Sequence, residues 1–519
     1  MQGRRILLLR ILLLLFPVGL TFTAQANNLV ISNVILTGQN TAEDYCYIRF
    51  DISWDNSWRN TSSAPNNWDA AWIFAKYRIG SGTWNHVMLN TTGNVAPDGS
   101  TLQVPADEVG AFFYRSADGS GTFSKTGVKL RWNYGEQGIG DDDVVDIKVF
   151  GLEMVYVPEG AFWVGSGGTG DNQFYKVGAT PSYYKIENEN EIIVGTDAGN
   201  LYYVSGGVDQ GDQAGPVPAA FPKGFNAFYS MKYELTQQQY VDFLNALPRS
   251  YQNNRTTTSI TGTDITNVFV LTGTASMSSR NGVRCDSPLP ATGPVHFYCD
   301  YNQNGSEGDA DDGREIACNF INWADLMAYL DWSGLRPMTE FEFEKICRGP
   351  LTPVLNEYAW GLSSGLVRNT GITDPGTINE TSANNANVSY KGDPTVGQLR
   401  VGAYAKNGTS RTQSGASYYG AMEMSGNTWE RPVTIGNATG RTYTGLHGDG
   451  NLSTLVGSAG DANVSYWPGE DATGGGFRGG WWNESNIYLR VSARGFASHV
   501  GDLRRERMGG RGVRTAPTN

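Results

Sequence analysis

GGGFRGGWWNESNIYLRVSAR, residues 474–494, is the stretch from which the fold of this chain can be worked out. Its five glycines allow the backbone to approach other chain segments or a ligand closely, where a Cβ would clash. Its two tryptophans are large apolar surfaces, each with an N–H that needs a partner when buried. The alternation of Ile487, Leu489 and Val491 is typical of a strand. The stretch is therefore either the wall of a core or the floor of a binding site, with Trp481, Trp482, Arg490 and Arg494 as the side chains that would contact a ligand.

The composition is that of a globular, loop-rich protein. Of 519 residues, 39% are hydrophobic and 17% charged, and 66 are glycine. This length is enough for two to four domains. The formal net charge of −12 makes nucleic acid a poor partner and favours hard cations.

The first 26 residues have the pattern of a secretion signal. Basic Arg4 and Arg5 precede an apolar run that is too short for a spanning helix, and Ala24 and Ala26 form a small-x-small cleavage site. The sequence has no second hydrophobic span. We therefore expect a secreted protein without a transmembrane segment, located in the periplasm, at the cell surface or outside the cell.

Residues 27–150 are predicted to form an antiparallel β-sandwich. Short runs rich in Val, Ile, Tyr, Phe and Trp alternate with turn residues, which is typical of strands. The expected strands are Val30–Leu36, Tyr45–Ile52, Ala70–Ile79, His86–Leu89, Ala111–Arg115, Val128–Tyr134 and Val144–Phe150.

Three helices are predicted in the remaining region, residues 151–519. Thr236 and Gln239 have capping-box spacing ahead of an apolar face. Asn322 and Gly334 bracket a second helix as its cap and its stop. A third helix, from Thr339 to Arg348, places Glu340 and Glu344 on one face and Glu342 on another. We therefore expect caps, ion pairs and surface groups from these carboxylates rather than a shared metal site.

A polar insertion contains a pattern similar to a calcium-binding loop. Oxygen-bearing side chains stand at its first, third, fifth and twelfth positions, with Gly305 at the sixth. The predicted ligands are Asp300, Asn302, Asn304 and Asp311. A solvated acidic loop is the alternative. Cys299 and Cys318 flank the loop, and a disulfide between them would close it.

A series of motifs in the second region resembles the formylglycine-generating enzyme, or sulfatase-modifying factor, superfamily. The motifs follow one another in the order of the family: VPEGAFWVG, FYSMKYELTQQQYVDFL, INWADLMAYLDWSGLRPMTEFEFEKICRG, YAWG, YYGAMEMSGNTWER, FRGGWW and GGRGVR. The resemblance implies a compact, irregular module related to C-type lectins. The expected fold class is therefore α+β, with signal peptide 1–26, sandwich 27–150 and family module 151–519.

The resemblance also implies one calcium site and bears on catalysis. Ca²⁺ would be held by the side chains of Glu423 and Glu430 and the carbonyls of Gly426 and Thr428. The family's enzyme oxidises a substrate cysteine with two copper-binding cysteines that follow the Arg-Gly-Gly motif. This chain has no cysteine after Cys347, and Cu(I) needs soft ligands, so copper is not expected. Iron is not expected either, because the four histidines are scattered.

Three functions are compatible with these observations. The first is a non-catalytic binding or structural module, stabilised by calcium, that recognises a peptide, a glycan or a partner protein. The second is a divergent formylglycine-generating or other metal-dependent oxidase. The third is a component of a bacterial envelope secretion or motility assembly.

Overall fold

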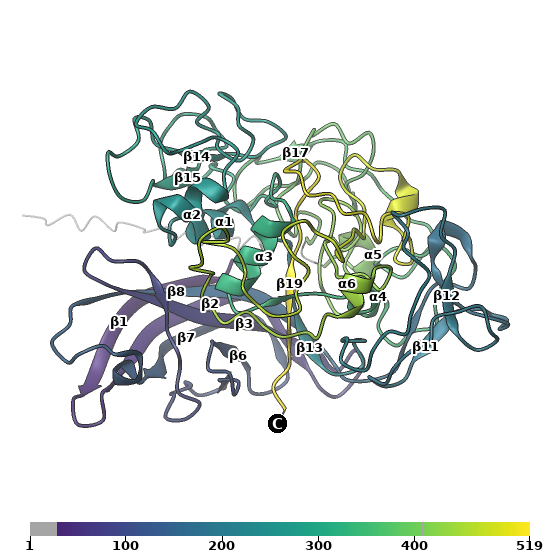
Figure 1. Ribbon diagram of the computed structural model, residues 1–519, viewed down its shortest axis with the longest axis horizontal. Coiled ribbons are helices and arrows are strands. Elements are labelled where there is room, and N and C mark those ends of the chain that lie inside the picture. Colours follow the sequence, from purple (N-terminus) through teal and green to yellow (C-terminus); the bar gives the residue numbers. More distant parts are fainter. Residues whose placement is uncertain (1–27, 407, 519) are drawn as a thin grey trace, which may run out of the picture.

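A computed structural model describes residues 28–406 and 408–518. The predicted signal segment lies outside these residues. The N-terminal strands stack at the lower left of Figure 1, and an irregular region with a few short helices lies above and beside them. This arrangement confirms the α+β class. No helix among the described residues has the length and apolarity needed to cross a membrane.

The N-terminal strands are antiparallel and largely match the prediction. They are β1 (Val30–Asn40), β2 (Tyr45–Asn60), β3 (Asn67–Ile79), β4 (Asn85–His86), β5 (Ser100–Gln103), β6 (Ala111–Arg115), β7 (Gly119–Trp132) and β8 (Val145–Val157). Strand β5 was not predicted, because its sequence, Ser-Thr-Leu-Gln, has little apolar character. Strand β2 pairs with β1 and β7 along its length but with β3 only at Arg59–Trp68 and Asn60–Asn67. The sandwich therefore turns a corner at that point.

Strand β3 is buried on both of its faces, and this explains its nearly continuous apolar sequence. Ala71, Ile73 and Ala75 face the core that β3 shares with β2 and β7. Trp72 and Phe74, pointing the other way, belong to the main core of the irregular region. One sheet thus serves two cores.

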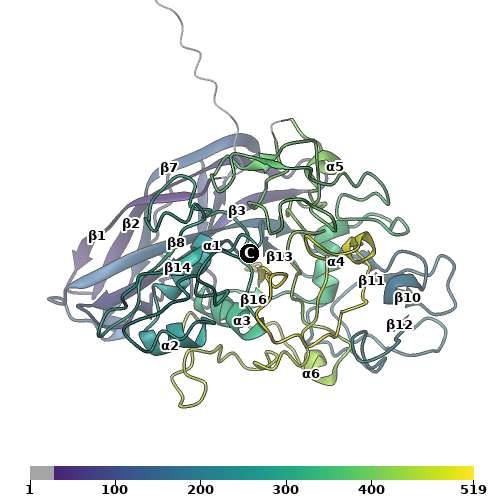
Figure 2. The ribbon, with the colours of Figure 1, turned by 90° about the horizontal axis from the view of Figure 1, so that it is seen from above.

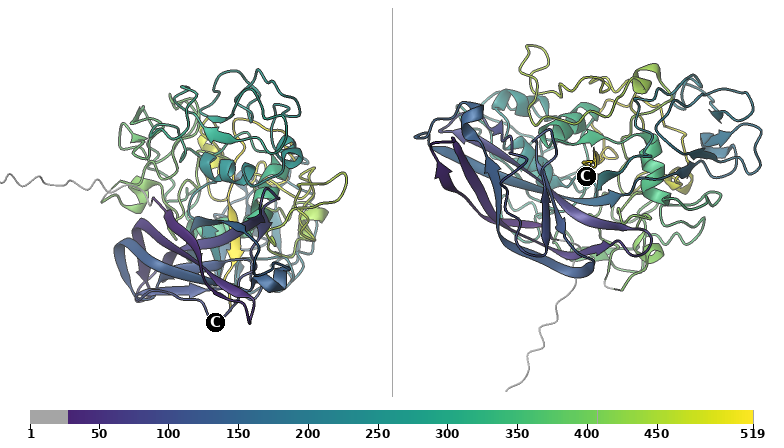
Figure 3. Two further views of the ribbon diagram at one scale, coloured as in Figure 1. Left: turned by 90° about the vertical axis from the view of Figure 1, so that its left-hand side faces the viewer. Right: turned by 90° about the horizontal axis from the view of Figure 1, so that it is seen from below.

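The sheet continues from the N-terminal strands into the irregular region. Its order is β1-β2-β3-β8-β13-β19-β16, where the last three are β13 (Phe228–Met231), β19 (Gly512–Thr515) and β16 (Arg336–Pro337). Strand β8 passes through residues 150 and 151, where the sequence-based domain boundary was placed. The division into two domains stays a prediction. Figure 3 shows the strands on one side and the irregular region packed against them.

The irregular region has short elements joined by long loops. Its helices are α1 (Gln237–Leu244), α2 (Arg249–Asn254), α3 (Trp323–Trp332), α4 (Glu340–Arg348), α5 (Arg411–Ser414) and α6 (Ala438–Arg441). Two-stranded ribbons pair β9 (Phe162–Val164) with β11 (Tyr184–Ile186), β10 (Phe174–Lys176) with β12 (Leu201–Tyr203), β14 (Val283–Cys285) with β15 (Phe297–Cys299), and β17 (Ile372–Thr373) with β18 (Thr381–Ser382). Figure 2 shows α1 and α3 over the central sheet and the β10–β12 ribbon at the far edge.

Capping boxes begin the three predicted helices. Thr236 with Gln239, Asn322 with Asp325, and Thr339 with Glu342 each make both reciprocal hydrogen bonds. These contacts satisfy backbone N–H groups that the first turn of a helix leaves free. The predicted starts of α1, α3 and α4 are thereby confirmed.

Helix α3 joins the sheet to the irregular region. Trp72 of β3 donates its indole N–H to the carbonyl of Ser333 at 2.8 Å, directly after α3. Phe74 of β3 and Phe150 of β8 contact Trp332 edge to face, with ring centroids 5.1 Å and 4.9 Å apart. Aromatic contacts of this kind are worth more than the area they bury.

We predict that Trp72→Ala destabilises the whole molecule by about 3–5 kcal/mol, because it leaves a cavity between the sheet and α3. Trp72→Phe keeps an aromatic ring but loses the N–H contact and part of the buried volume, so it should cost less, about 1–3 kcal/mol. Denaturant unfolding followed by fluorescence and circular dichroism measures both. Two separate unfolding transitions, of which only one shifts to lower denaturant concentration in the variant, would contradict this prediction.

Candidate functional site

The stretch 474–494 is folded into the centre of the irregular region and is not a strand. Residues Asn486–Leu489 form a 3₁₀ helix, η3, and the rest is turn and loop. The predicted strand fails because Ile487, Leu489 and Val491 have no partner strand. The glycines act as expected, since a Cβ on Gly476 would lie 1.8 Å from the carbonyl oxygen of Ala497.

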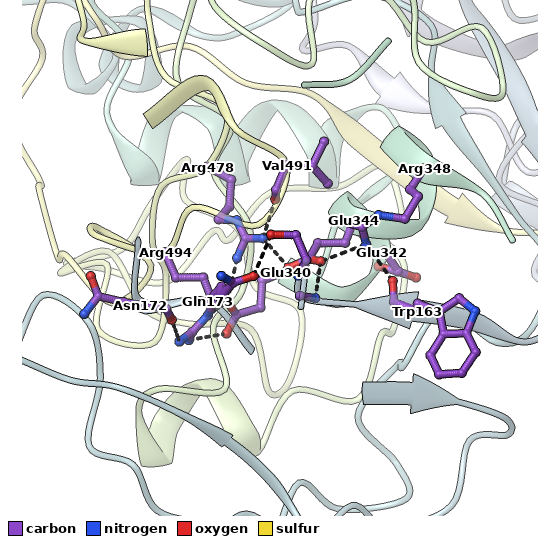
Figure 4. Close-up of polar contacts among 12 residues, drawn as sticks. Trp163, Asn172, Gln173, Glu340, Glu342, Glu344, Arg348, Arg478, Val491 and Arg494 are labelled. Atoms are coloured by element: carbon purple, nitrogen blue, oxygen red, sulfur yellow. Dashed lines mark hydrogen bonds and ion pairs between the residues drawn. The ribbon is translucent and has the colours of Figure 1, made fainter. Parts of the chain in front are cut away.

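The arginines of this stretch are fixed by helix α4. Arg478 pairs with Glu340 at 3.1 Å and with Glu344 at 2.7 Å, and Arg494 pairs with Glu340 at 2.7 Å. All four side chains are fully buried. Figure 4 shows both guanidinium groups directed at the carboxylates of α4.

The network continues on the far side of α4. Arg348 contacts Glu344, four residues before it, and Glu357. Three arginines therefore face three glutamates, and the buried charges balance. Burial works against ionisation of Glu340, but the arginines outweigh it and hold its pKa below the ordinary value. Glu342 pairs separately with Arg336, so the predicted ion-pair role of the α4 carboxylates is confirmed. Their predicted surface position is wrong, because all three are buried with their arginine partners.

The predicted ligand-contacting side chains are engaged inside the protein. Trp481 and Trp482 are 7% and 6% exposed and pack with Trp429, Phe477 and Met508. Arg494 is held by Glu340, and its guanidinium lies 4.1 Å from the ring centres of Phe174 and Tyr203. Arg490 pairs with Asp171. These contacts favour the core-wall interpretation of the stretch, although the buried indole N–H of Trp482 has no hydrogen-bond partner among the described residues. The role of these side chains in ligand binding stays a prediction.

The proposed calcium ligands lie around a buried arginine. Arg511 pairs with Glu430 and donates to the carbonyl of Met422 at 2.7 Å. Glu423 accepts from the backbone N–H of Gly402, and a third buried carboxylate, Glu234, accepts from Asn427 and Thr428. Burial raises the pKa of Glu423 to about 7, against the opposing charge of Arg511.

One carboxylate oxygen of Glu423 and one of Glu430 are buried without a hydrogen-bond partner. Such oxygens are costly to leave unsatisfied, and a bound cation would satisfy them. The hard oxygen donors of Glu423 and Glu430 thus fit Ca²⁺ in chemical type.

In the second predicted calcium site, the loop of residues 300–311, the polar side chains mostly contact the loop itself and a nearby arginine. Asp300 is buried and pairs with Arg284 at 2.7 Å. The side-chain oxygens of Asn302 and Asn304 accept backbone N–H groups of the loop itself, and Asn302 donates to Asp311 at 2.8 Å. The loop thus satisfies several of these polar atoms internally, and the calcium loop stays a prediction. The flanking Cys299 and Cys318 are buried free thiols in the structure, in contrast to the predicted disulfide.

The described residues contain no group of three or more His, Cys, Asp or Glu side chains placed to hold a metal ion. His447 contacts Asp107, and His499 contacts Asp209. The five cysteines are all buried, and burial raises the pKa of each thiol.

The family follows from comparison with known proteins. The model of the Sulfatase-modifying factor enzyme 1-like domain family matches residues 152–516, more than half of the chain. The chain belongs to this family. The match spans every motif quoted above, including the α4 network and the carboxylates around Arg511. No curated protein matches the sequence.

Two features of this family domain were not found from the sequence. Glu234 is the next-to-last residue of the motif FYSMKYEL, whose apolar pattern gave no sign that its carboxylate would join Glu423 and Glu430. The charge partners of Arg478 and Arg494 lie more than 130 residues earlier in the chain. No local sequence pattern indicates that pairing.

We predict that Glu340→Gln destabilises the protein by about 3–5 kcal/mol, because two buried guanidinium groups lose their shared charge. Asp212→Asn is the matched control. Asp212 pairs with Arg441 but its side chain is 39% exposed, so its loss should cost below about 1 kcal/mol. Chemical unfolding of both variants measures the difference, and equal costs would contradict the central role of Glu340.

Proposed function

We propose that this protein is a secreted or surface binding module, non-catalytic and stabilised by calcium, on the scaffold of the sulfatase-modifying factor family. One observation carries the proposal: the segment after Arg478-Gly479-Gly480 has no cysteine. In the enzyme that the chain resembles, copper-binding thiols follow this motif. Here Trp481 and Trp482 occupy the positions immediately after it and pack into the core.

The remaining thiols are poor substitutes for a copper pair. All of them lie at or before Cys347 and are buried, with the pKa of each raised by burial. A thiolate is the form that binds soft metals and reacts, so a raised pKa disfavours both. A divergent oxidase is the second candidate, and no contact among the described residues favours it.

We predict that the purified protein, supplied with copper, does not oxidise the cysteine of a CxPxR peptide. Mass spectrometry of the peptide detects the decrease in peptide mass that accompanies conversion of the cysteine to an aldehyde. An active formylglycine-generating enzyme in the same assay is the control. Turnover by this chain would overturn the non-catalytic proposal in favour of the oxidase.

Calcium has a structural part in this proposal. The side chains of Glu423 and Glu430 and the carbonyls of Gly426 and Thr428 would hold it. When bound, Ca²⁺ would supply positive charge to carboxylate oxygens that are buried without partners. Arg511 already neutralises part of this negative charge, so the expected gain is added stability rather than folding itself.

We predict that EDTA lowers the melting temperature of the wild type by several degrees, because a ligand that binds only the folded state stabilises it. A Glu423→Gln, Glu430→Gln double variant should lose this response. Asp311→Asn, in the loop whose oxygens are satisfied internally, should keep it. If the melting temperature of the wild type is the same with and without EDTA, the structural role of calcium is ruled out.

A further inference from the structure

A pocket lies at the corner where the N-terminal sandwich meets the family domain. Its volume is about 450 Å³. We call it the corner pocket, and its lining includes Arg59, Trp68, Gln103, Tyr114, Tyr156 and Glu159. Residues 515–518, at and after the end of β19, close one side of it. Pockets of this size are typical of small-molecule sites.

The sandwich corner fixes the position of Arg59. Arg59 on β2 and Trp68 on β3 are register partners in the short pairing that joins these strands. The Arg59 guanidinium lies over the Trp68 ring, 4.2 Å from its centre, and 5.5 Å from that of Tyr114. Tyr156 stacks on Trp68 at 3.9 Å and 10°. The guanidinium is therefore held flat at the end of an aromatic stack.

Arg59 makes no close ion pair with a carboxylate of the described residues, although the charge of the exposed Asp118 acts on it from a greater distance. Its Nη1 is buried without a hydrogen-bond partner. An unsatisfied buried donor is costly, and a guanidinium presents paired N–H groups that match a carboxylate. The guanidinium can therefore accept an anion that approaches it more closely than Asp118 does.

The other polar groups of the pocket indicate what else the ligand carries. The exposed Glu159 is part of the lining, and Gln103 and Asn226 add amide groups. Glu159 and the net charge of −12 disfavour a doubly charged phosphate. Carboxylate and amide groups suit the hydroxyls of a sugar. A singly charged sugar acid meets both requirements, because it offers a carboxylate to Arg59 and hydroxyls to the other polar groups.

We propose that the corner pocket binds a sugar carboxylate of the uronate class, with its carboxylate on Arg59 and its hydroxyls on Gln103, Glu159 and Asn226. This inference deepens the proposed binding role and rests on it. The two can fail separately, because the peptide assay reads cysteine oxidation and the experiment below reads sugar binding.

The experiment is calorimetric titration of the purified protein with glucuronate, glucose and benzoate. Glucuronate should bind saturably, and glucose and benzoate each at least about tenfold more weakly, since each lacks one of the recognised features. Arg59→Met should weaken glucuronate binding about 10- to 100-fold, the usual effect of losing hydrogen bonds to a charged group.

Arg78→Met is the matched control. Arg78 also lies over a tryptophan, Trp84, at 4.7 Å, but it pairs with Asp146 outside the pocket, so binding should not change. Should Arg59→Met fold poorly, Arg59→Lys keeps the charge without the planar donors and should weaken binding about tenfold. Absence of saturable glucuronate binding, equal binding of glucose, equal binding of benzoate, or an Arg59 variant that binds like the wild type would each overturn the proposal.

Discussion

The pairing of helix α4 with Arg478 and Arg494 is the interaction on which the irregular region depends. This region has few hydrogen-bonded elements, so its loops need fixed points in the core. Glu340 supplies one, because its carboxylate also accepts the backbone N–H of Ile435 at 2.9 Å. Three chain segments that are distant in sequence therefore meet at one carboxylate. An apolar contact could bury the same area, but it would not fix the direction of each segment in the same way.

The buried ion-pair network and the pocket proposed for ligand binding lie in different parts of the molecule. The stretch 474–494 contains tryptophan and arginine side chains that are typical of a binding surface. In the structure these side chains make internal contacts. The spacious polar corner pocket lies elsewhere, where the N-terminal strands meet the family domain. Its walls come from both the N-terminal strands and the family domain. A ligand bound there would contact a surface that neither part forms alone.

Much of the fold could be predicted from local sequence, and much of the site could not. Strands such as β3 and helices such as α3 follow from apolar periodicity and capping residues that are close in the chain. The contacts of Arg494 could not be predicted, because an arginine beside tryptophans looks the same whether it faces solvent or a buried glutamate. The same limit applies to Arg59, whose partners Trp68 and Tyr114 lie together only after the sandwich has turned its corner.

The position of β19 has a consequence for the order of folding. Residues 512–515 pair with β13 on one side and with β16 on the other. Both neighbours precede β19 by well over a hundred residues, so the central sheet is incomplete until this strand has been made. Contacts so distant in sequence fold slowly. Until β19 has been synthesised, β13 and β16 each have an open edge, and open strand edges can pair with other chains.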